Sequence, residues 1–573
     1  MNRIKVLRVC LLVAVAIIGL RLFFIQIIEH EKWVKEAGAQ QTMQNLIVAE
    51  RGKIYMMAGE KPTVVVMNEP VWTVLVDPMV ANQKKVSKVI DQVAKKEKIA
   101  SWQEVFKDKN LRYFVVAKNV RRQAAEKIKQ ANLSGVWLRK EVRRVYPEGQ
   151  LGAAMLGFVN AEGKGQYGVE GSLNKELSGK NGLLKTVKDI NNIPLTIGSD
   201  NVRVPAEHGK NLVLTVDRNI QYNVEKILRN ALRRVGASHA SALVMNPRNG
   251  QIQAMATLPS YDAANFSEVK DGRVFQNDPV ENAYEPASVC KTFSFAAAIN
   301  DGVMSPNTTY ENLGYTMVDG WKINNAYTGQ LGRVTMQTAL NFSLNTGSTQ
   351  ALRLLGGDPS RINRAGREKL YDYYHKRFGF GDYTGIELLE GKGLLTGPNQ
   401  GDGLNSNYAN MTFGQNLNLT MIQVTAAFAA VVNGGDYYTP TIVAGELKDG
   451  KFERKKHAKP VRKVVSRNTS ETMREMLYKA RGSRRLYGID KAGYFVGGKT
   501  GTAQVIKNGA YSLDETVASY VGFGGASQEL PEYVIMVKIW EEGKRIEGER
   551  DAMPIFDEIS NYIQSYLKIE PKG

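Results

Sequence analysis

Cysteine is nearly absent from this chain of 573 residues, which contains only two. Cys10 lies in an apolar stretch close to the amino terminus and Cys290 lies near the middle of the chain, so the two are not expected to pair. A fold that depends on disulfide bonds is therefore excluded. The hydrophobic share of 43% is ample for packed cores, and a chain of this length is expected to form two or more domains.

Histidine is scarce as well, with five residues scattered along the chain. They are His30, His208, His239, His375 and His457. None belongs to a pair with metal-ligand spacing or to a nucleophile turn of the Gly-x-Ser-x-Gly type. This pattern argues against a zinc amidase and against a Ser/His/Asp hydrolase. We expect no metal and no cofactor.

A concentrated basic block is also missing, although the formal net charge is +19. The positive residues are spread along the chain rather than gathered into one segment studded with aromatic residues. No nucleic-acid module is evident, so we expect no nucleic-acid partner. The basic balance fits attraction to anionic surfaces such as lipid headgroups.

Residues 9–28 form an apolar stretch that is interrupted only by Arg21 and Gln26. At 1.5 Å per residue, a helix of this length covers roughly the 30 Å of a bilayer's hydrocarbon. Basic residues at positions 3, 5 and 8 precede it, so the amino terminus should stay in the cytoplasm. The sequence predicts a single-pass membrane anchor, with everything after about residue 30 on the outer side.

A cleaved signal peptide is the alternative interpretation of this stretch. Residues 37–39, Ala-Gly-Ala, offer small side chains of the kind that signal peptidases accept. A charged spacer over residues 30–36 precedes them, and such a spacer makes a poor cleavage region. We therefore expect the anchor to stay uncleaved.

Ser288 and Lys291 stand three residues apart where a helix is expected to begin. Pro286 suits the first turn of a helix, and residues 293–299 continue as a mostly apolar run. Residues three apart share one face of a helix, so the Lys291 amine would lie beside the Ser288 hydroxyl. A lysine can take a serine proton only when burial lowers its pKa. The pair suggests a nucleophile with its own base, although Ser-x-x-Lys alone is more often solvated helix surface.

Two further motifs follow in the order that serine and lysine acyl-enzymes use. Ser343-Leu344-Asn345 supplies a second hydroxyl and an amide. Lys499-Thr500-Gly501-Thr502 follows a strand-like run over residues 494–496 and two glycines. Each motif is common by itself, but the three in this order are hard to assign to chance. We therefore expect one active site built from all three.

On these motifs the chain resembles the class B penicillin-binding proteins, monofunctional D,D-transpeptidases that cross-link peptidoglycan. The resemblance covers most of the chain. In the catalytic half, the blocks that resemble the family are residues 211–221, 413–420 and 518–523. In the amino-terminal half, they are residues 51–54, 144–147, 157–159, 167–171 and 177–182. Two departures are Asn416, where the family usually has glycine, and Gly525, where a proline is common.

We expect an α+β fold with three parts. Residues 1–30 would form a cytoplasmic tip and the transmembrane anchor. Residues 40–207 read as a mixed α/β region without a catalytic constellation, which predicts an elongated pedestal or dimerisation domain. Residues 208–570 would form the penicillin-binding transpeptidase domain, with an antiparallel sheet packed between helices.

The expected elements follow from periodicity and turn residues. In the pedestal, strands are predicted over residues 63–67 and 71–78, and helices over 86–99 and 121–132. In the last part, a strand is predicted over 212–216, helices over 220–234 and 554–567, a hairpin over 242–256, and strands over 516–523 and 533–540. This arrangement is the one that the resemblance also implies.

The resemblance implies a catalytic role for five side chains. Ser288 would attack the bond between two terminal D-alanines, and neutral Lys291 would accept its proton. Ser343 would relay that proton to the leaving D-alanine. Asn345 would hold Lys291 and a substrate amide, and Lys499 would face the substrate's terminal carboxylate.

The resemblance also implies how substrate is bound. The hydroxyl groups of Thr500 and Thr502, on either side of Gly501, would join Lys499 at the terminal carboxylate. Backbone N–H groups of Ser288 and Thr502 would form the oxyanion hole. β-Lactams would acylate Ser288 because they imitate the scissile amide.

The partners implied by the resemblance are peptidoglycan stem peptides, β-lactams, the membrane, and an integral-membrane glycan polymerase of the division or elongation machinery. The layout favours septal over lateral synthesis. Three alternatives stay open. A D,D-carboxypeptidase would use water as the acceptor, a β-lactamase would need a deacylating base that no motif marks, and a scaffold subunit would carry a catalytically slow domain.

Overall fold

The structure is a computed structural model that describes residues 3–33, 36, 42–100, 102–108, 111–187, 202–399, 404–456, 458–483, 490–507 and 509–572. His457 and the small residues at 37–39 lie outside the described residues. The chain divides into two compact units. The first unit is Met1–Gly52 with Ser178–Lys210, and the second is Lys53–Leu177 with Asn211–Gly573.

The first unit carries the predicted anchor as a continuous helix. α1 (Arg3–Phe23) runs directly into the π-helix η1 (Phe24–Ile28), and together they form a span of 26 residues that is long and apolar enough to cross a membrane. Neither helix contains a buried residue, so their apolar side chains are free to meet lipid. The unit also contains an antiparallel sheet of β1 (Thr42–Ile47), β8 (Gly182–Val187) and β9 (Val202–Val204), in that order.

The second unit contains two large sheets, of which the first has seven strands. Its order is β19-β18-β10-β2-β3-β4, with β5 paired to β3. The strands are β2 (Ile54–Ala58), β3 (Lys61–Val76), β4 (Phe114–Val120), β5 (Val136–Val145), β10 (Leu212–Asp217), β18 (Val443–Lys448) and β19 (Lys451–Arg454). The helices α3 (Gln83–Val93) and α4 (Arg122–Gln130) share a core with β3 and β4.

Two predictions for this region were wrong in detail. The strands expected over residues 63–67 and 71–78 are one strand, β3, because Pro70 is accommodated opposite Val142 in the ladder with β5. The helix expected over residues 86–99 begins earlier, since the Asn82 side chain caps it by accepting from the Lys85 N–H at 3.1 Å. It ends earlier too, because the chain turns into a β-bridge between Lys98 and Ala117.

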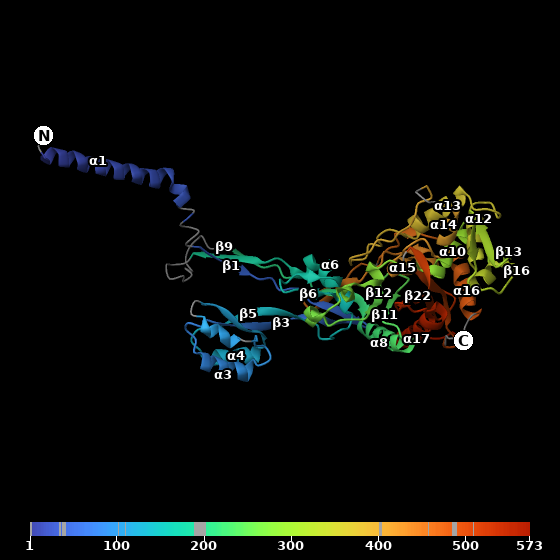
Figure 1. Ribbon diagram of the computed structural model, residues 1–573, viewed down its shortest axis with the longest axis horizontal. Helices are drawn as coiled ribbons and strands as arrows, with labels where there is room; N and C mark the ends of the chain where they lie inside the picture. Colours follow the sequence, from blue (N-terminus) through green and yellow to red (C-terminus); the bar gives the residue numbers. More distant parts are fainter. Residues whose placement is uncertain are drawn as a thin grey trace. The chain divides into compact units, whose positions relative to one another are not determined.

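The second sheet is antiparallel throughout, in the order β12-β11-β23-β22-β21. Its strands are β11 (His239–Met245), β12 (Ile252–Leu258), β21 (Phe495–Lys507), β22 (Ala510–Gly525) and β23 (Tyr533–Trp540). The helices α8 (Arg218–Val235) and α17 (Met553–Tyr566) cover one face, and α10 (Lys291–Asn300), α15 (Met421–Val432) and α16 (Arg467–Ser483) cover the other (Figure 1).

The strand β11 shows the two-sided burial of this sheet directly. Ala242 and Val244 belong to the core under α8 and α17, whereas Leu243 and Met245 belong to the core on the opposite face. The predicted α+β fold, with an antiparallel sheet packed between helices, is thereby confirmed. The predicted hairpin and closing strands correspond to β11, β12, β22 and β23.

The ends of α8 follow from local chemistry. Asp217 caps its first turn by accepting from the N–H groups of Asn219 and Ile220 at 2.8 and 3.1 Å. Gly236, at φ 66°, ends the helix in the left-handed conformation that glycine adopts without strain. The helix therefore extends two residues before and one after the predicted range of 220–234.

Shorter elements complete the second unit. Around the first sheet they are η2 (Trp102–Lys107), α5 (Ala153–Leu156), β6 (Phe158–Val159), β7 (Gly165–Gln166), α6 (Gly168–Ser172) and α7 (Asn174–Ser178). Around the second they are η3 (Ala263–Glu268), η4 (Gly272–Phe275), α9 (Asp278–Glu281), η5 (Ala287–Cys290), β13 (Thr309–Asn312), β14 (Tyr315–Val318), β15 (Trp321–Asn324), β16 (Gly332–Thr335), α11 (Met336–Asn341), α12 (Asn345–Leu355), α13 (Arg364–Tyr371), η6 (Asp372–Arg377), α14 (Asn405–Met411), β17 (Asp436–Tyr437), β20 (Arg462–Lys463) and η7 (Gly548–Ala552).

Candidate active site

Ser288 lies in the short 3-10 turn η5, which leads directly into α10. Ala287, the residue before it, has φ 50°, a left-handed conformation that costs a non-glycine residue roughly 1 kcal/mol. The Ala287 N–H donates to the Gly414 carbonyl at 3.1 Å and helps to hold this turn. Lys291 is the first residue of α10, so the local sequence places the serine and the lysine at one helix start, as predicted.

The Lys291 amine lies within hydrogen-bond distance of both predicted serine hydroxyls. Its Nζ is 2.9 Å from Ser288 Oγ and 3.1 Å from Ser343 Oγ, and it donates to the Ser343 carbonyl at 2.6 Å. The side chain is 1% exposed. Burial, and then the positive charge of Lys499, lower the pKa of Lys291 well below its ordinary value. A larger share of the amine is then neutral near neutral pH, which is the form that can accept a proton.

Ser343 is aimed at the lysine by an unusual backbone conformation. It joins α11 to α12 at φ 55°, and the neighbouring Leu344 is fully buried. The Leu344 N–H donates to the Ala339 carbonyl at 2.8 Å, which fixes the turn. Both the carbonyl and the hydroxyl of Ser343 therefore meet Lys291, and a strained residue at this point is typical of a functional site.

Asn345 lies two residues after Ser343, at the start of α12. Its Nδ2 donates to the Asn324 carbonyl at 2.8 Å, and its predicted contact with Lys291 stays a prediction. The side chain lines a groove of about 450 Å³ together with Phe413, Trp321 and Asn407. The Phe413 ring centroid is 6.0 Å from Lys291 Nζ, so this groove ends beside the lysine.

Lys499 lies on the outer strand β21 of the five-stranded sheet and is 4% exposed. Its Nζ donates to the carbonyl and hydroxyl oxygens of Thr500 at 3.2 and 3.3 Å. Lys499, Thr500 and Ser343 line one small cavity of about 40 Å³. The third predicted motif therefore meets the second at this cavity.

Gly501 explains how β21 comes close to the nucleophile turn. A Cβ at this position would clash with the Pro286 carbonyl oxygen and the Ser519 hydroxyl. Only glycine therefore allows the strand to pass so near to Ser288. This close approach brings the third motif to the first.

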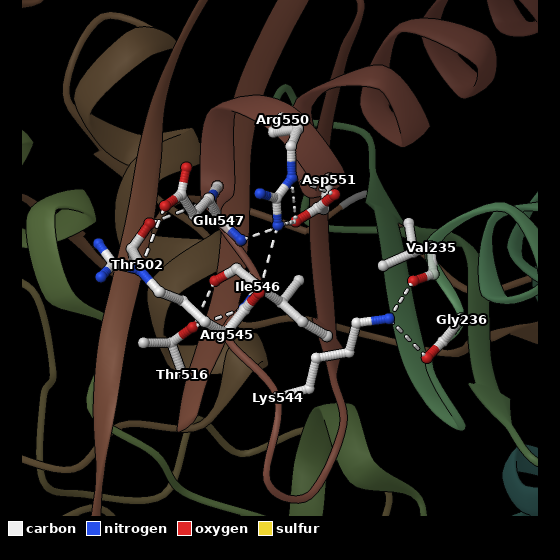
Figure 2. Close-up of polar contacts among 11 residues, drawn as sticks. Val235, Gly236, Thr502, Thr516, Lys544, Arg545, Ile546, Glu547, Arg550 and Asp551 are labelled. Atoms are coloured by element: carbon white, nitrogen blue, oxygen red, sulfur yellow. Dashed lines mark hydrogen bonds and ion pairs between the residues drawn. The ribbon is translucent and has the colours of Figure 1, made fainter. Parts of the chain in front are cut away.

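The Thr502 hydroxyl is held from behind by a segment that the sequence did not mark. Its Oγ1 accepts a hydrogen bond from the Gly548 N–H at 3.0 Å, and Figure 2 shows Thr502 beside the chain around residues 544–551. Because the oxygen accepts this bond, the hydroxyl proton is left to donate to another acceptor. A Cβ on Gly548 would clash with the Gly501 carbonyl oxygen.

The segment that carries Gly548 is itself fixed to the sheet, as Figure 2 shows. The Ile546 N–H donates to Thr516 Oγ1 at 2.8 Å, and that hydroxyl donates to the Ile546 carbonyl at 2.5 Å. The Glu547 N–H donates to Asp551 Oδ2 at 2.8 Å. Lys544 donates to the Val235 carbonyl at 2.6 Å. Gly548 is thus presented to Thr502 from a rigid support.

Glu285 and Asn416 are further residues of this region that the motifs did not identify. The Asn416 N–H donates to Glu285 Oε1 at 2.8 Å. Asn416 has φ 59°, which explains why the family favours glycine here and why asparagine is tolerated. Burial raises the pKa of the Glu285 carboxyl. The position of Glu285 directly before Pro286 was the only sequence signal.

Comparison with known proteins identifies the family to which this fold belongs. A family model described as the penicillin binding protein transpeptidase domain matches residues 240–561, and one described as the penicillin-binding protein dimerisation domain matches residues 46–214. The chain belongs to the class B penicillin-binding proteins. The resemblance drawn from the three motifs is thereby confirmed.

Relatives of this class B protein extend over nearly its full length. It is 31% identical over 570 residues to stage V sporulation protein D of Bacillus subtilis, covering 97% of this chain and 84% of the relative. It is 26% identical to the peptidoglycan D,D-transpeptidase FtsI of Buchnera aphidicola, covering 97% and 93%. The crystal structure of penicillin binding protein 2X from Streptococcus thermophilus matches with a TM-score of 0.72 at 22% identity, covering 92% of this chain and 81% of that one, which shows the shared fold.

The family assignment also confirms the predicted kind of enzyme. The transpeptidase family consists of serine acyltransferases, and its members act on peptidoglycan stem peptides and bind β-lactams. This protein is accordingly a serine-type transpeptidase with an amino-terminal helix suited to a single-pass membrane anchor.

Proposed function

We propose that this protein is a peptidoglycan D,D-transpeptidase that cross-links stem peptides through an acyl-serine intermediate during septal wall synthesis, and that β-lactams inhibit it. The observation that carries the proposal is the buried Lys291 amine, 2.9 Å from Ser288 Oγ and with a lowered pKa. A buried, deprotonated lysine beside a serine is the arrangement that activates a hydroxyl without histidine.

In the first step, Ser288 Oγ attacks the carbonyl carbon between the two terminal D-alanines of a stem peptide. Lys291 Nζ takes the hydroxyl proton, and an oxyanion forms on the carbonyl oxygen. The amide C–N bond then breaks, and the leaving D-alanine nitrogen receives the proton from Lys291 by way of the Ser343 hydroxyl. The 3.1 Å distance from Lys291 Nζ to Ser343 Oγ supports this relay.

The substrate is bound by the third motif. Lys499 and the hydroxyl groups of Thr500 and Thr502 take the terminal carboxylate, and Gly501 keeps the strand within reach. The free proton of the Thr502 hydroxyl supports this role, because Gly548 occupies its oxygen. The N–H groups of Ser288 and Thr502 stabilise the oxyanion, and such donors each contribute roughly a hundredfold or more to the rate.

In the second step, an amine from a neighbouring strand attacks the acyl carbon and gives a proton to the neutral Lys291 amine. The bond between the acyl carbon and Ser288 Oγ then breaks, and Ser288 Oγ takes that proton from Lys291. Asn345 orients the amide of the donor peptide, since it stands at the edge of the groove beside Phe413. A D,D-carboxypeptidase would use water in this step with the same residues. The presence or absence of a cross-linked product separates the two.

The apolar helix near the amino terminus supports an assignment of this chemistry to the outer side of the membrane. We propose that the amino terminus stays in the cytoplasm, as its basic residues suggest, and that residues 208–570 act on the outer side. Residues 40–207 would serve as the pedestal. The partner would be an integral-membrane glycan polymerase of the division machinery, and the relatives named FtsI and stage V sporulation protein D support septal work.

The test is covalent labelling of the full chain in detergent with a fluorescent penicillin, followed by mass spectrometry of the adduct. We expect a stable adduct on Ser288 that Ser288→Ala lacks. Ser267→Ala, which changes an exposed serine, should label like the native chain. The absence of any adduct would instead favour the scaffold subunit, and rapid loss of adduct with drug hydrolysis would favour a β-lactamase.

Transfer itself is tested with a synthetic pentapeptide stem and an amine acceptor. We expect release of D-alanine together with a cross-linked product. Release of D-alanine without that product would reassign the protein as a D,D-carboxypeptidase.

A further inference from the structure

Three polar residues from distant parts of the chain meet beside the nucleophile turn. Glu285 precedes Ser288, Asn416 follows Phe413, and Tyr511 lies on β22 near the end of the β21–β22 hairpin. The Tyr511 hydroxyl oxygen lies 3.0 Å from Glu285 Oε1 and 3.2 Å from Asn416 Oδ1. Its one proton is therefore shared between a carboxylate oxygen and an amide oxygen.

The contact is more than a surface hydrogen bond. Glu285 is 9% exposed, and its Oε1 also accepts the Asn416 N–H at 2.8 Å. The Asn416 side chain in turn donates to Asn407 Oδ1 at 2.9 Å, which fixes its orientation. Burial and the Glu285 carboxylate raise the pKa of Tyr511, so its hydroxyl stays a donor near neutral pH. Hydrogen bonds to a buried carboxylate are among the stronger ones.

Tyr511 is well placed to hold the far half of β21, by which we mean residues 503–506. It lies directly opposite Ile506 in the ladder between β21 and β22. The ladder is irregular between Gln504 and Ile506, where a register shift loosens the pairing. Beyond this shift, Tyr511 ties the hairpin to Glu285 and thus to the chain segment that carries Ser288.

The far half of β21 matters because of the direction in which substrate runs. Under the proposed function, on which this inference rests, the terminal carboxylate lies at Lys499 and the scissile carbonyl lies at Thr502. The earlier residues of the stem peptide then continue along residues 503–506. β21 is the outer strand of its sheet, so it can accept an extended peptide as an added strand.

We propose that Glu285, Asn416 and Tyr511 form a clasp that positions residues 503–506 of β21 for the long donor peptide. Tyr511 and Asn416 are positioning residues, since neither reaches the reacting atoms through the contacts above. A small β-lactam needs the lysine and the hydroxyl groups of the third motif but not the far half of the strand. The clasp therefore selects for donors of stem-peptide length.

Two β-lactams that react with the same serine test the clasp, because only one of them carries a side chain like a stem peptide. The full chain in detergent is acylated by benzylpenicillin and, in parallel, by a β-lactam whose side chain copies the first three residues of a stem peptide. For Tyr511→Phe, we expect the second-order acylation rate for the peptide-bearing β-lactam to fall about tenfold, the size expected for losing a hydrogen bond to a charged group. The benzylpenicillin rate should stay within about twofold.

Two matched variants sharpen the result. Asn416→Gly keeps the left-handed backbone and the N–H bond to Glu285 but removes Oδ1, so it should show the same selectivity with a smaller loss. Tyr222→Phe changes a half-exposed tyrosine on α8, which packs on β12 at the opposite edge of the sheet, and should leave both rates unchanged.

An equal fall in both rates for Tyr511→Phe would overturn the clasp, because it would indicate general damage to the fold. Unchanged rates for both β-lactams would overturn it as well. If the native chain forms no adduct with either compound, the acyl-serine mechanism itself is rejected. The failure of the proposed function is thus distinguished from the failure of the clasp.

Discussion

Two buried basic residues of the second unit, Arg144 beside the seven-stranded sheet and Lys291 beside the five-stranded sheet, are held in opposite ways. Beside the seven-stranded sheet, Arg144 donates to Glu170 and to Asn68 Oδ1, each at 2.7 Å. Beside the five-stranded sheet, Lys291 contacts hydroxyl and carbonyl oxygens and, within the described ranges, forms no ion pair. The Glu170 carboxylate compensates the charge of Arg144, whereas burial without a carboxylate partner favours the neutral form of Lys291. Arg144 therefore stabilises the fold, whereas Lys291 is suited to accept a proton.

The largest effect is expected at Lys291. Lys291→Met keeps a similar length and volume but removes the base, so acylation by penicillin should fall about a thousandfold. Because a poorly solvated amine is replaced by an apolar side chain, Tm should stay equal or rise. Stopped-flow labelling and thermal unfolding of the full chain measure the two quantities.

Lys84→Met, which changes an exposed lysine on α3, is the control for Lys291→Met. Its acylation rate and its Tm should both match those of the native chain. A Lys291→Met protein that is acylated at the native rate would show that another group takes the serine proton.

An intermediate effect is expected at Gly548. In Gly548→Ala the new Cβ presses on the Gly501 carbonyl and moves the N–H away from Thr502. Acylation should fall by roughly tenfold to a hundredfold, because the hydroxyl and the oxyanion donor of Thr502 lose their positions. The rate of labelling by fluorescent penicillin measures this loss.

Gly482→Ala adds the same methyl group where nothing lies within 4 Å, and it should label at the native rate. Equal rates for the two alanine variants would refute the supporting role of Gly548.

The smallest effect on rate is expected at Arg144. Arg144→Met removes an ion-pair partner of the buried Glu170, so the free energy of unfolding should fall by about 3 kcal/mol. The acylation rate of the folded protein should not change. Denaturant titration and labelling of the same sample give both values.

Arg122→Met, which breaks an exposed pair with Glu126, should lower the free energy of unfolding by only about 0.5 kcal/mol. A large loss of acylation rate in Arg144→Met would contradict the claim that Arg144 stabilises the fold without taking part in the chemistry.

Much of the site could be predicted because its residues fall in three short motifs. Ser288 and Lys291 are neighbours on one helix start, so spacing alone brings them together. Ser343 meets Lys291 only through tertiary structure, but its motif and its order along the chain were informative. The hairpin and the closing strands were predictable for a similar reason, since their alternation is local.

The supporting residues could not be predicted, because their partners are chosen by packing. Gly548 reaches Thr502 across 46 positions, and Tyr511 reaches Glu285 across 226. No periodicity or motif marks either pair. The strands β18 and β19 are similar cases, because they join a sheet whose other strands lie more than 200 residues earlier. Long-range pairing of this kind depends on the whole fold.

The most direct test of the account is the pH dependence of Ser288 acylation by penicillin in the full chain. The neutral amine of Lys291 is the reactive form, and its pKa is lowered by burial and by Lys499. The account predicts that the rate rises with pH as Lys291 loses its proton, with a midpoint well below the ordinary lysine value of about 10.4. A rise centred on that ordinary value, or the same profile in Lys291→Met, would contradict the account.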